Sequence, residues 1–263
     1  MGATTGIAWC DATVNVWWGC TKVSAACHRC YAEAASKRYG KDVWGPGKPR
    51  EDHRAGARKL ALKLERQAVR EGRRIRVFSA SMSDWLDEEV PPEWLAELLC
   101  LIDETPHLRW LLLTKRPQLF GFRMRAVKRT DVRGSELARR WLDGLAPRNA
   151  WVGTTVEDQQ RADERIPELL SIPARLAFLS CEPLLEPVSL RRWMGPGEIG
   201  YVIAGGESGH GARRTELEWL RSLRDECAAA DVPYFLKQLG GHPNKRANVD
   251  EFPEDLRIQD VPT

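Results

Sequence analysis

The sequence predicts an α/β protein with a parallel sheet, arranged as a closed or partly open β/α barrel or as a doubly wound sheet. Three observations support this prediction. The chain has 263 residues, a length that β/α barrels commonly have. Strand-like and helix-like segments alternate along it, which favours parallel pairing of the strands. Several strand-like segments are unbroken apolar runs, which favours their burial on both faces.

The predicted elements follow one another with no linker long enough to mark a domain boundary, so we expect one domain over residues 1–263. This domain carries a cysteine loop at 19–31 and a basic helical insertion at roughly 45–73. Strands rich in β-branched, aromatic and other apolar residues are expected at 74–79, 108–114, 150–155, 175–180, 201–204 and 233–237. Helices are expected at 31–39, 91–104, 135–145, 159–170 and 216–230, besides a basic amphipathic helix that ends at Arg70.

The composition predicts a soluble protein of the cytoplasm. Hydrophobic residues make up 43% and charged residues 29% of the chain, which is typical of globular proteins. No apolar run approaches the length of a membrane span, and the first residues lack the pattern of a signal peptide, so no membrane partner is expected. Cytoplasmic thiols stay reduced, so disulfides are not expected among the seven cysteines. Cys100 and Cys227 lie in apolar or helical patterns and are expected to be buried.

The net charge of +3 conceals two basic stretches. Residues 48–76 hold eleven Lys and Arg against four Asp and Glu, or 11 − 4 = +7. Residues 121–148 hold eight against three, or 8 − 3 = +5. Such stretches form either solvated helix faces or a surface for a phosphate backbone. Nucleic acid is therefore an expected partner through these two stretches.

Polar residues follow the end of each of the six predicted strands. In parallel α/β folds the chemistry lies at the carboxyl ends of the strands, so we expect a shared pocket there rather than independent helix caps. Gly205 and Gly206 would let backbone N–H groups approach a ligand closely. Glu157 and Glu182 could bind ribose hydroxyls or an ammonium group, and Lys115 with its neighbour Arg116 suits an anion. The expected catalytic residues are Lys115, Glu182 and Glu207, and the expected cofactor contacts are Ser81, Asp84, Thr114, Thr154, Glu157, Ser180, Gly205, Gly206 and Lys237.

Three cysteines with the spacing C-x6-C-x2-C are the candidate metal ligands: Cys20, Cys27 and Cys30. A structural zinc ion would need a fourth ligand, and His28 is too close in sequence to its neighbours to serve. A catalytic zinc ion with three thiolates and a water is a second possibility, although the His-x-Glu element of deaminases is absent from the sequence. A [4Fe–4S] cluster with one iron open to a small molecule is a third. Buried free thiols are the remaining alternative.

The segment Asn15-Val-Trp-Trp-Gly-Cys and the segment Cys27-His-Arg-Cys-Tyr-Ala-Glu resemble a phage- and bacterium-encoded family with a three-cysteine motif. Further matches to this family are 43–45, 81–84, 114–117, 153–157, 180–184, 205–209 and 237–238, so the resemblance covers nearly the whole chain. The family is poorly characterised in function. It is similar to radical S-adenosylmethionine (SAM) enzymes, and among these most nearly to the spore photoproduct lyases.

This resemblance implies a partial barrel of about six to seven parallel strands, with a [4Fe–4S] cluster on the three cysteines. It implies that SAM binds the open iron, and that reduction by an external electron donor yields a 5′-deoxyadenosyl radical. The usual spacing of such enzymes is C-x3-C-x2-C, which this chain departs from. Thr154 and Glu157 are the residues that the family pattern places nearest a ribose.

The leading interpretation is therefore a radical SAM-type enzyme that repairs or modifies a nucleic acid or a nucleotide base. The likeness to the spore photoproduct lyases implies DNA rather than RNA as the polymer that the stretches 48–76 and 121–148 would bind. A zinc-dependent enzyme or zinc-stabilised nucleic-acid-binding module is the alternative. A third possibility is an interaction protein that keeps the fold without catalysis. Trp17, Trp18 and Trp44 lie near the cysteines in sequence and would either shield a cluster or stack on a base.

Overall fold

The computed structural model describes residues 5–130, 132–241 and 246–262, and its α/β fold confirms the predicted class. The strands of the parallel sheet have the order β1-β4-β5-β6-β7-β8-β9. This order follows the chain without a reversal, so the sheet is singly wound, as in a β/α barrel, rather than doubly wound. The prediction of a partial parallel barrel is therefore confirmed. Residue 131 of the basic stretch 121–148 and the extreme N-terminal residues 1–4 lie outside the described part.

The chain forms two compact units, which we describe separately. The N-terminal unit comprises Met1–Val23, Cys30–Val152 and Ile172–Arg175. The C-terminal unit comprises Ser24–Arg29, Gly153–Ser171 and Leu176–Thr263. The single-domain organisation predicted from the sequence stays a prediction.

The N-terminal unit holds the first strands and most of the helices. Its strands in the sheet are β1 (Ala12–Thr13), β4 (Ile75–Ser79), β5 (Leu108–Thr114) and the first half of β6 (Ala150–Thr155). Strand β4 pairs in parallel with β1 on one side and with β5 on the other, which brings Ser79 opposite Leu112. Two short strands, β2 (Trp17–Trp18) and β3 (Glu51–Asp52), form a separate antiparallel pair.

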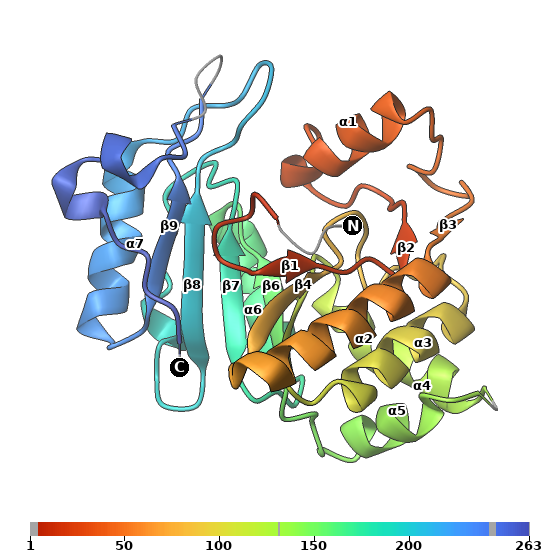
Figure 1. The fold of residues 1–263 in the computed structure, drawn as a ribbon. Coiled ribbons are helices and arrows are strands. Elements are labelled where there is room, and N and C mark those ends of the chain that lie inside the picture. Colours follow the sequence, from red (N-terminus) through yellow and green to blue (C-terminus); the bar gives the residue numbers. More distant parts are fainter. Residues whose placement is uncertain (1–4, 131, 242–245, 263) are drawn as a thin grey trace. The chain divides into compact units, whose positions relative to one another are not determined.

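The described residues of this unit form five α-helices: α1 (Tyr31–Arg38), α2 (Arg54–Glu71), α3 (Pro92–Glu104), α4 (Phe120–Lys128) and α5 (Ser135–Leu142). Helix α2 runs beside α3, and α3 contacts α4 and α5 (Figure 1). The predicted basic insertion at 45–73 therefore contains β3 and a regular crossover helix, α2, that leads into β4. The core under these helices is aromatic, since the buried Trp85 and Trp141 rings stack at 5.9 Å and Phe120 meets Trp141 edge-on.

The C-terminal unit continues the sheet with the second half of β6, then β7 (Ala177–Cys181), β8 (Ile199–Gly205) and β9 (Tyr234–Gln238). Its helices are α6 (Gln159–Leu170) and α7 (Leu217–Ala229), and α7 packs against β8 and β9 (Figure 1). The side chain of Asp158 caps α6 by accepting a hydrogen bond from the Arg161 N–H at 2.7 Å. Phe178, Tyr201 and Leu236 are fully buried side chains of these strands.

Most predicted elements agree with the observed ones to within one or two residues, and the differences have local causes. The helix predicted at 135–145 ends at Leu142, because Gly144 follows with a φ of +86°. Helix α4 was not predicted from the basic stretch that contains it. Strands β1, β2 and β3 have two residues each and were also missed, because so short a segment shows no periodicity.

Candidate functional site

The three motif cysteines differ from the other four in their exposure. All seven cysteines are free thiols; Cys20, Cys27 and Cys30 are half-buried, whereas the remaining four are buried: Cys10, Cys100, Cys181 and Cys227. The predicted burial of Cys100 and Cys227 is confirmed. Cys20 and Cys30 belong to the N-terminal unit and Cys27 to the C-terminal unit. Among the described residues, no group of three or more His, Cys, Asp or Glu side chains has the arrangement of a metal site.

In the N-terminal unit, backbone contacts fix the loop that carries Cys20. The N–H of Gly19 donates to the carbonyl of Met82 at 3.0 Å, and the N–H of Gly45 donates to the carbonyl of Cys20 at 2.9 Å. Gly19 has a φ of +110°, and a Cβ atom there would collide with the carbonyl oxygen of Val43. A residue without a side chain is therefore required directly before the first cysteine.

The Arg116 guanidinium links the Cys20 loop to a buried carboxylate. Its Nη1 lies 3.5 Å from the Sγ of Cys20 and 2.9 Å from Oδ2 of Asp84, and its Nη2 donates to the carbonyl of Thr21 at 2.5 Å. Burial raises the pKa of the Cys20 thiol to about 12, and the Asp84 charge acts in the same direction while the Arg116 charge opposes it. A metal ion or cluster that binds Cys20 must therefore displace its proton.

Asp84, a predicted cofactor contact, is buried and fully engaged by protein groups. It accepts hydrogen bonds from the hydroxyl of Thr114 at 2.7 Å and from the N–H groups of Lys115 and Leu86 at 2.9 and 3.0 Å. Burial opposes ionisation of this carboxyl, yet the Arg116 charge and these donors together lower its pKa. Asp84 and Thr114 thus form one polar cluster with Arg116 at the ends of β4 and β5.

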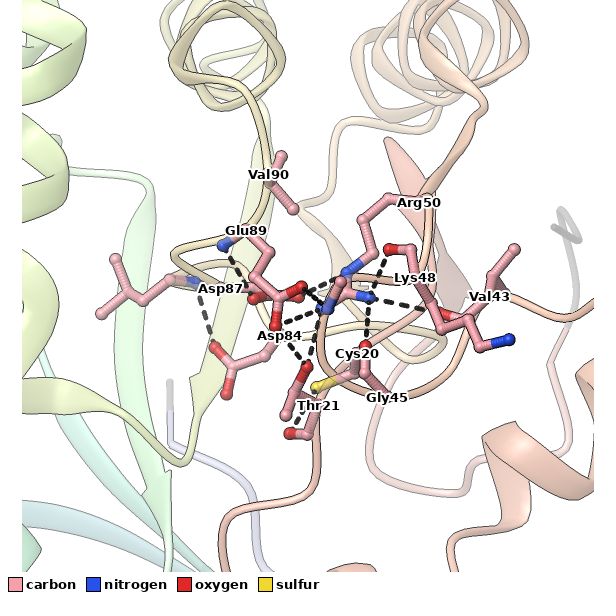
Figure 2. Close-up of polar contacts among 12 residues, drawn as sticks. Cys20, Thr21, Val43, Gly45, Lys48, Arg50, Asp84, Asp87, Glu89 and Val90 are labelled. Atoms are coloured by element: carbon pink, nitrogen blue, oxygen red, sulfur yellow. Dashed lines mark hydrogen bonds and ion pairs between the residues drawn. The ribbon is translucent and has the colours of Figure 1, made fainter.

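A second buried arginine, Arg50, was missed by the sequence analysis. Its Nε donates to Asp87 at 2.8 Å and its Nη2 to the Thr21 hydroxyl at 2.9 Å, while its Nη1 binds three backbone carbonyls. Figure 2 shows Arg50 among these acceptors, with Asp87 on one side, Lys48 and Val43 on the other, and Thr21 and Cys20 below. The sequence offered no signal for this role, because Arg50 is one of eleven cations in the basic stretch 48–76.

The start of α1, directly after Cys30, is tied to the end of β4. The Tyr31 hydroxyl donates to the carbonyl of Ser81 at 2.7 Å, and the Asn15 amide donates to the Ser81 hydroxyl at 2.9 Å. The structure therefore places Ser81 near both of the N-terminal unit's cysteine segments. Of the three nearby tryptophans, Trp17 is buried, Trp18 packs on Tyr39 and His53, and Trp44 pairs with Cys20 through the backbone.

In the C-terminal unit, the segment Ser24–Arg29, which carries Cys27, is held by strand-end residues. The N–H of Ala26 donates to Oε1 of Glu157 at 3.5 Å, and Arg213 donates to the carbonyl of Ala25 at 3.1 Å. Glu157 is fully buried and also accepts from Arg165 at 2.8 Å. Glu157 therefore binds the cysteine segment itself; its predicted contact with a ribose stays a prediction.

Glu207 has a similar role. It forms ion pairs with Arg213 and, at 3.3 Å, with Arg29 of the cysteine segment. Burial opposes ionisation of Glu207, but the hydrogen bonds from Arg213 and Arg29 outweigh it and lower the pKa of this carboxyl. Two of the strand-end carboxylates predicted to face a ligand, Glu157 and Glu207, thus anchor the segment around Cys27.

The other strand-end residues of this unit form a close-packed group. Lys237 pairs with Glu182 at 2.8 Å, and the Gln238 amide donates to the carbonyl of Gly206 at 2.7 Å. A Cβ atom at Gly206 would collide with the carbonyl oxygen of Leu239, and one at Gly205 would lie 3.0 Å from Oε1 of Glu182. Close approach of two chain segments therefore explains both glycines. Thr154 and Ser180 are buried in β6 and β7.

Lys115 differs from these paired residues. It is half-buried, and no ion pair to it occurs within the part of the chain that the structure describes. Arg165, Arg213 and Arg29 were not identified from the sequence, which contains 40 Lys and Arg without a pattern that marks these three. The described residues include no helix whose length and hydropathy would allow it to cross a membrane.

Comparison with curated proteins finds no match, and comparison with solved structures finds none either. A protein-family profile, in contrast, matches residues 4–257, which is nearly the entire chain. The matched segment includes all three motif cysteines and every strand-end residue described above. The chain belongs to the family described as protein of unknown function (DUF5131).

Proposed function

We propose that this protein is a radical SAM-type iron–sulfur enzyme that acts on a nucleic acid or a nucleotide base, by repair or modification. Cys20, Cys27 and Cys30 would hold a [4Fe–4S] cluster, and SAM would be the second cofactor. When bound and reduced, the cluster supplies the electron that cleaves SAM to a 5′-deoxyadenosyl radical, for which an external electron donor is needed. The motif segments resemble a three-cysteine family that is itself similar to radical SAM enzymes, most nearly to the spore photoproduct lyases, and this resemblance supports the reaction class.

One observation carries the proposal: the three motif cysteines are half-buried residues, whereas the other four cysteines are buried. A metal centre needs sulfur atoms that an incoming ion can reach, whereas inert core thiols have no such requirement. Three thiolates with no fourth at matching spacing suit a cluster with one open iron. The Arg116 N–H at 3.5 Å from Cys20 Sγ adds a donor of the kind that tunes cluster sulfurs.

The chain's own residues have separate tasks in this proposal. Arg116 holds Cys20 against Asp84, and the Glu157 and Glu207 carboxylates hold the segment of Cys27. Lys115 has a cationic side chain with no ion-pair partner in the described residues, so it is the candidate to bind a carboxylate or phosphate of SAM or substrate. Glu182 and Lys237, paired at 2.8 Å, provide a polar wall beside Gly205.

Anaerobic reconstitution with iron and sulfide tests this function. Wild-type protein should turn brown, bind about four irons and release 5′-deoxyadenosine from SAM when a reductant is present. Cys27→Ala should lose both the colour and the cleavage. Cys227→Ala, which removes a buried thiol outside the motif, is the matched control and should retain both.

Two results would overturn the proposal. A colourless protein with stoichiometric zinc, lost in Cys27→Ala, would identify the zinc-dependent alternative. A stable cluster that releases no 5′-deoxyadenosine from SAM at any reductant concentration would identify the protein as a non-catalytic interaction protein that holds a cluster.

A further inference from the structure

Four cations lie in one line along α2. Lys59, Lys63, Arg66 and Arg70, here called the basic stripe, have the spacing i, i+4, i+7, i+11. With 3.6 residues per turn, these positions project within about 60° of one another and extend over about 16 Å of the helix axis. All four residues are exposed.

The basic stripe carries uncompensated charge. Within the described part of the chain, no ion pair involves any of its four residues. The two acidic residues of α2, Glu65 and Glu71, lie off the stripe and contact His107 and Arg73. Of the other seven cations of the stretch 48–76, Arg74 donates to the carbonyl of Pro106, and six have carboxylate partners within 4 Å, namely Lys48, Arg50, Arg54, Arg58, Arg73 and Arg76. The net charge of this stretch is therefore concentrated on one helix face.

The opposite face of α2 is already used by the fold. Ala57, Ala61, Leu64 and Ala68 are buried, and α2 contacts α3, β4 and β5. A helix that lies in a membrane surface needs its apolar face free to enter the lipid. Because that face is occupied, the basic stripe suits a purely electrostatic partner with regularly spaced negative charge.

We propose that the basic stripe docks the phosphate backbone of double-stranded DNA. Duplex DNA presents one negative charge per about 1.7 Å of its axis, so a straight line of four cations can face several phosphates at once. Contacts of this kind position a protein on the duplex without reading its sequence. The inference builds on the proposed function by naming its polymer substrate and the surface that receives it.

The second basic stretch, 121–148, offers a weaker surface. Among its described cations, Arg123 is buried, and Arg133, Arg139 and Arg140 pair with Glu104, Glu136 and Asp103. Helix α4 presents Arg125 and Lys128, followed by Arg129 at its end, over a single nine-residue helix. This group is shorter than the basic stripe, but together with the exposed Arg148 it provides a control with the same number of cations.

The test measures binding of the full chain to a fluorescent 20-base-pair duplex as a function of salt. The quadruple variant Lys59→Gln, Lys63→Gln, Arg66→Gln, Arg70→Gln should reduce the slope of log K against log salt by up to about 3.6, at about 0.9 per phosphate contact. Each single substitution should reduce it by about 0.9. The control Arg125→Gln, Lys128→Gln, Arg129→Gln, Arg148→Gln should retain most of the wild-type slope. Circular dichroism verifies that both quadruple variants are folded. If a quadruple variant does not fold, the salt slopes of the single variants test the proposal instead.

Several outcomes overturn the proposal. A wild-type chain without salt-dependent duplex binding, or an equal loss in both quadruple variants, would remove the basic stripe as the docking surface. Tighter binding to single-stranded RNA, or to vesicles of phosphatidylserine and phosphatidylcholine, would assign the stripe to another partner. Cluster content and SAM cleavage are measured on the same variants. If only the docking proposal is wrong, the wild-type protein still holds a cluster and cleaves SAM. If only the proposed function is wrong, the protein lacks a cluster but still binds the duplex through the basic stripe.

Discussion

Arg116 joins the first motif cysteine to a buried carboxylate: its Nη1 lies 3.5 Å from Cys20 Sγ and 2.9 Å from Asp84 Oδ2. Cys20 and Arg116 are 96 residues apart in the chain. The same guanidinium binds the carbonyl of Thr21, so one side chain fixes both the sulfur and its backbone. The ends of β4 and β5 are thereby connected to the Cys20 loop within the N-terminal unit.

The Asp84–Arg116 pair predicts a strong coupling in stability. Arg116→Met would leave Asp84 buried without its cation, which typically costs about 3–5 kcal/mol of unfolding free energy. Asp84→Asn would leave Arg116 buried with its charge unpaired at this site and should cost a similar amount. The double variant should cost clearly less than the sum, because neither charge remains uncompensated. Urea unfolding of metal-free protein measures all four free energies, and additive losses would contradict the coupling.

Gly19 predicts a steric requirement next to Cys20. Gly19→Ala should destabilise the protein through its φ of +110° and through the collision of Cβ with the Val43 carbonyl. Gly40→Ala is the matched control, since Gly40 has a φ of +70° with no atom within 4 Å of a Cβ. The left-handed backbone costs both variants about 1–2 kcal/mol, and overpacking should add about 1–3 kcal/mol at Gly19 alone. Equal midpoints of urea unfolding would refute the packing argument.

The segment around Cys27 predicts a change in thiol reactivity. Arg213 pairs with Glu207 and donates to the Ala25 carbonyl, so Arg213→Met should loosen the segment and raise the alkylation rate of Cys27 several-fold. Arg214→Met is the control, because the adjacent Arg214 is exposed and pairs with Glu216 instead. Iodoacetamide labelling of metal-free protein, followed by mass spectrometry, gives the rate for each cysteine. The fully buried Cys181 serves as an unreactive internal reference. Identical Cys27 rates in the two variants would show that Arg213 does not restrain the segment.

Asp255 predicts a pH-dependent contribution to stability. Hydrogen bonds from Arg221 and Arg224 lower the pKa of Asp255 to about 2 in the folded protein. A depressed carboxyl pKa stabilises the fold above the unfolded value of about 3.9, and this contribution is lost as pH falls toward 2. Asp255→Asn should therefore lower the thermal midpoint at pH 7, and the difference from wild type should vanish near pH 2.

A second exposed aspartate provides the control for this prediction. Asp260 has no side-chain ion pair in the described part of the chain, so Asp260→Asn should leave the midpoint nearly unchanged at each pH. Differential scanning calorimetry at pH 7, at about pH 4 and at about pH 2 covers the window set by the two pKa values of Asp255. A gap between Asp255→Asn and wild type that stays constant with pH would argue against the ion pair.

Local patterns were sufficient to predict the regular elements. Strands β5 and β6 and helix α6 have the predicted bounds, since unbroken apolar runs and helical spacing are properties of adjacent residues. The burial of Cys100 and Cys227 followed from the same patterns. Helix α4 was missed because its Phe-Gly-Phe start and basic composition resemble a loop as much as a helix.

The partners of the strand-end residues could not be predicted in this way. Glu157 was expected to face a ligand, yet it is fully buried and accepts hydrogen bonds from Ala26 and Arg165. Contacts between residues far apart in the chain depend on how strands and loops pack, and the sequence does not encode them at any fixed spacing. An arginine that binds a buried carboxylate therefore has the same appearance in the sequence as one in water.

The sequence by itself determined the α/β class, the order of the longer strands and of most helices, and the three cysteines that distinguish this chain. Only the tertiary structure decided which carboxylates are engaged by arginines, that the motif cysteines are half-buried while the others are buried, and that the unpaired cations of α2 form one line. The physical reason is the range of the interactions involved. Hydrogen-bonding propensity and hydrophobic periodicity act between neighbours in sequence, whereas burial and charge pairing are properties of the folded neighbourhood.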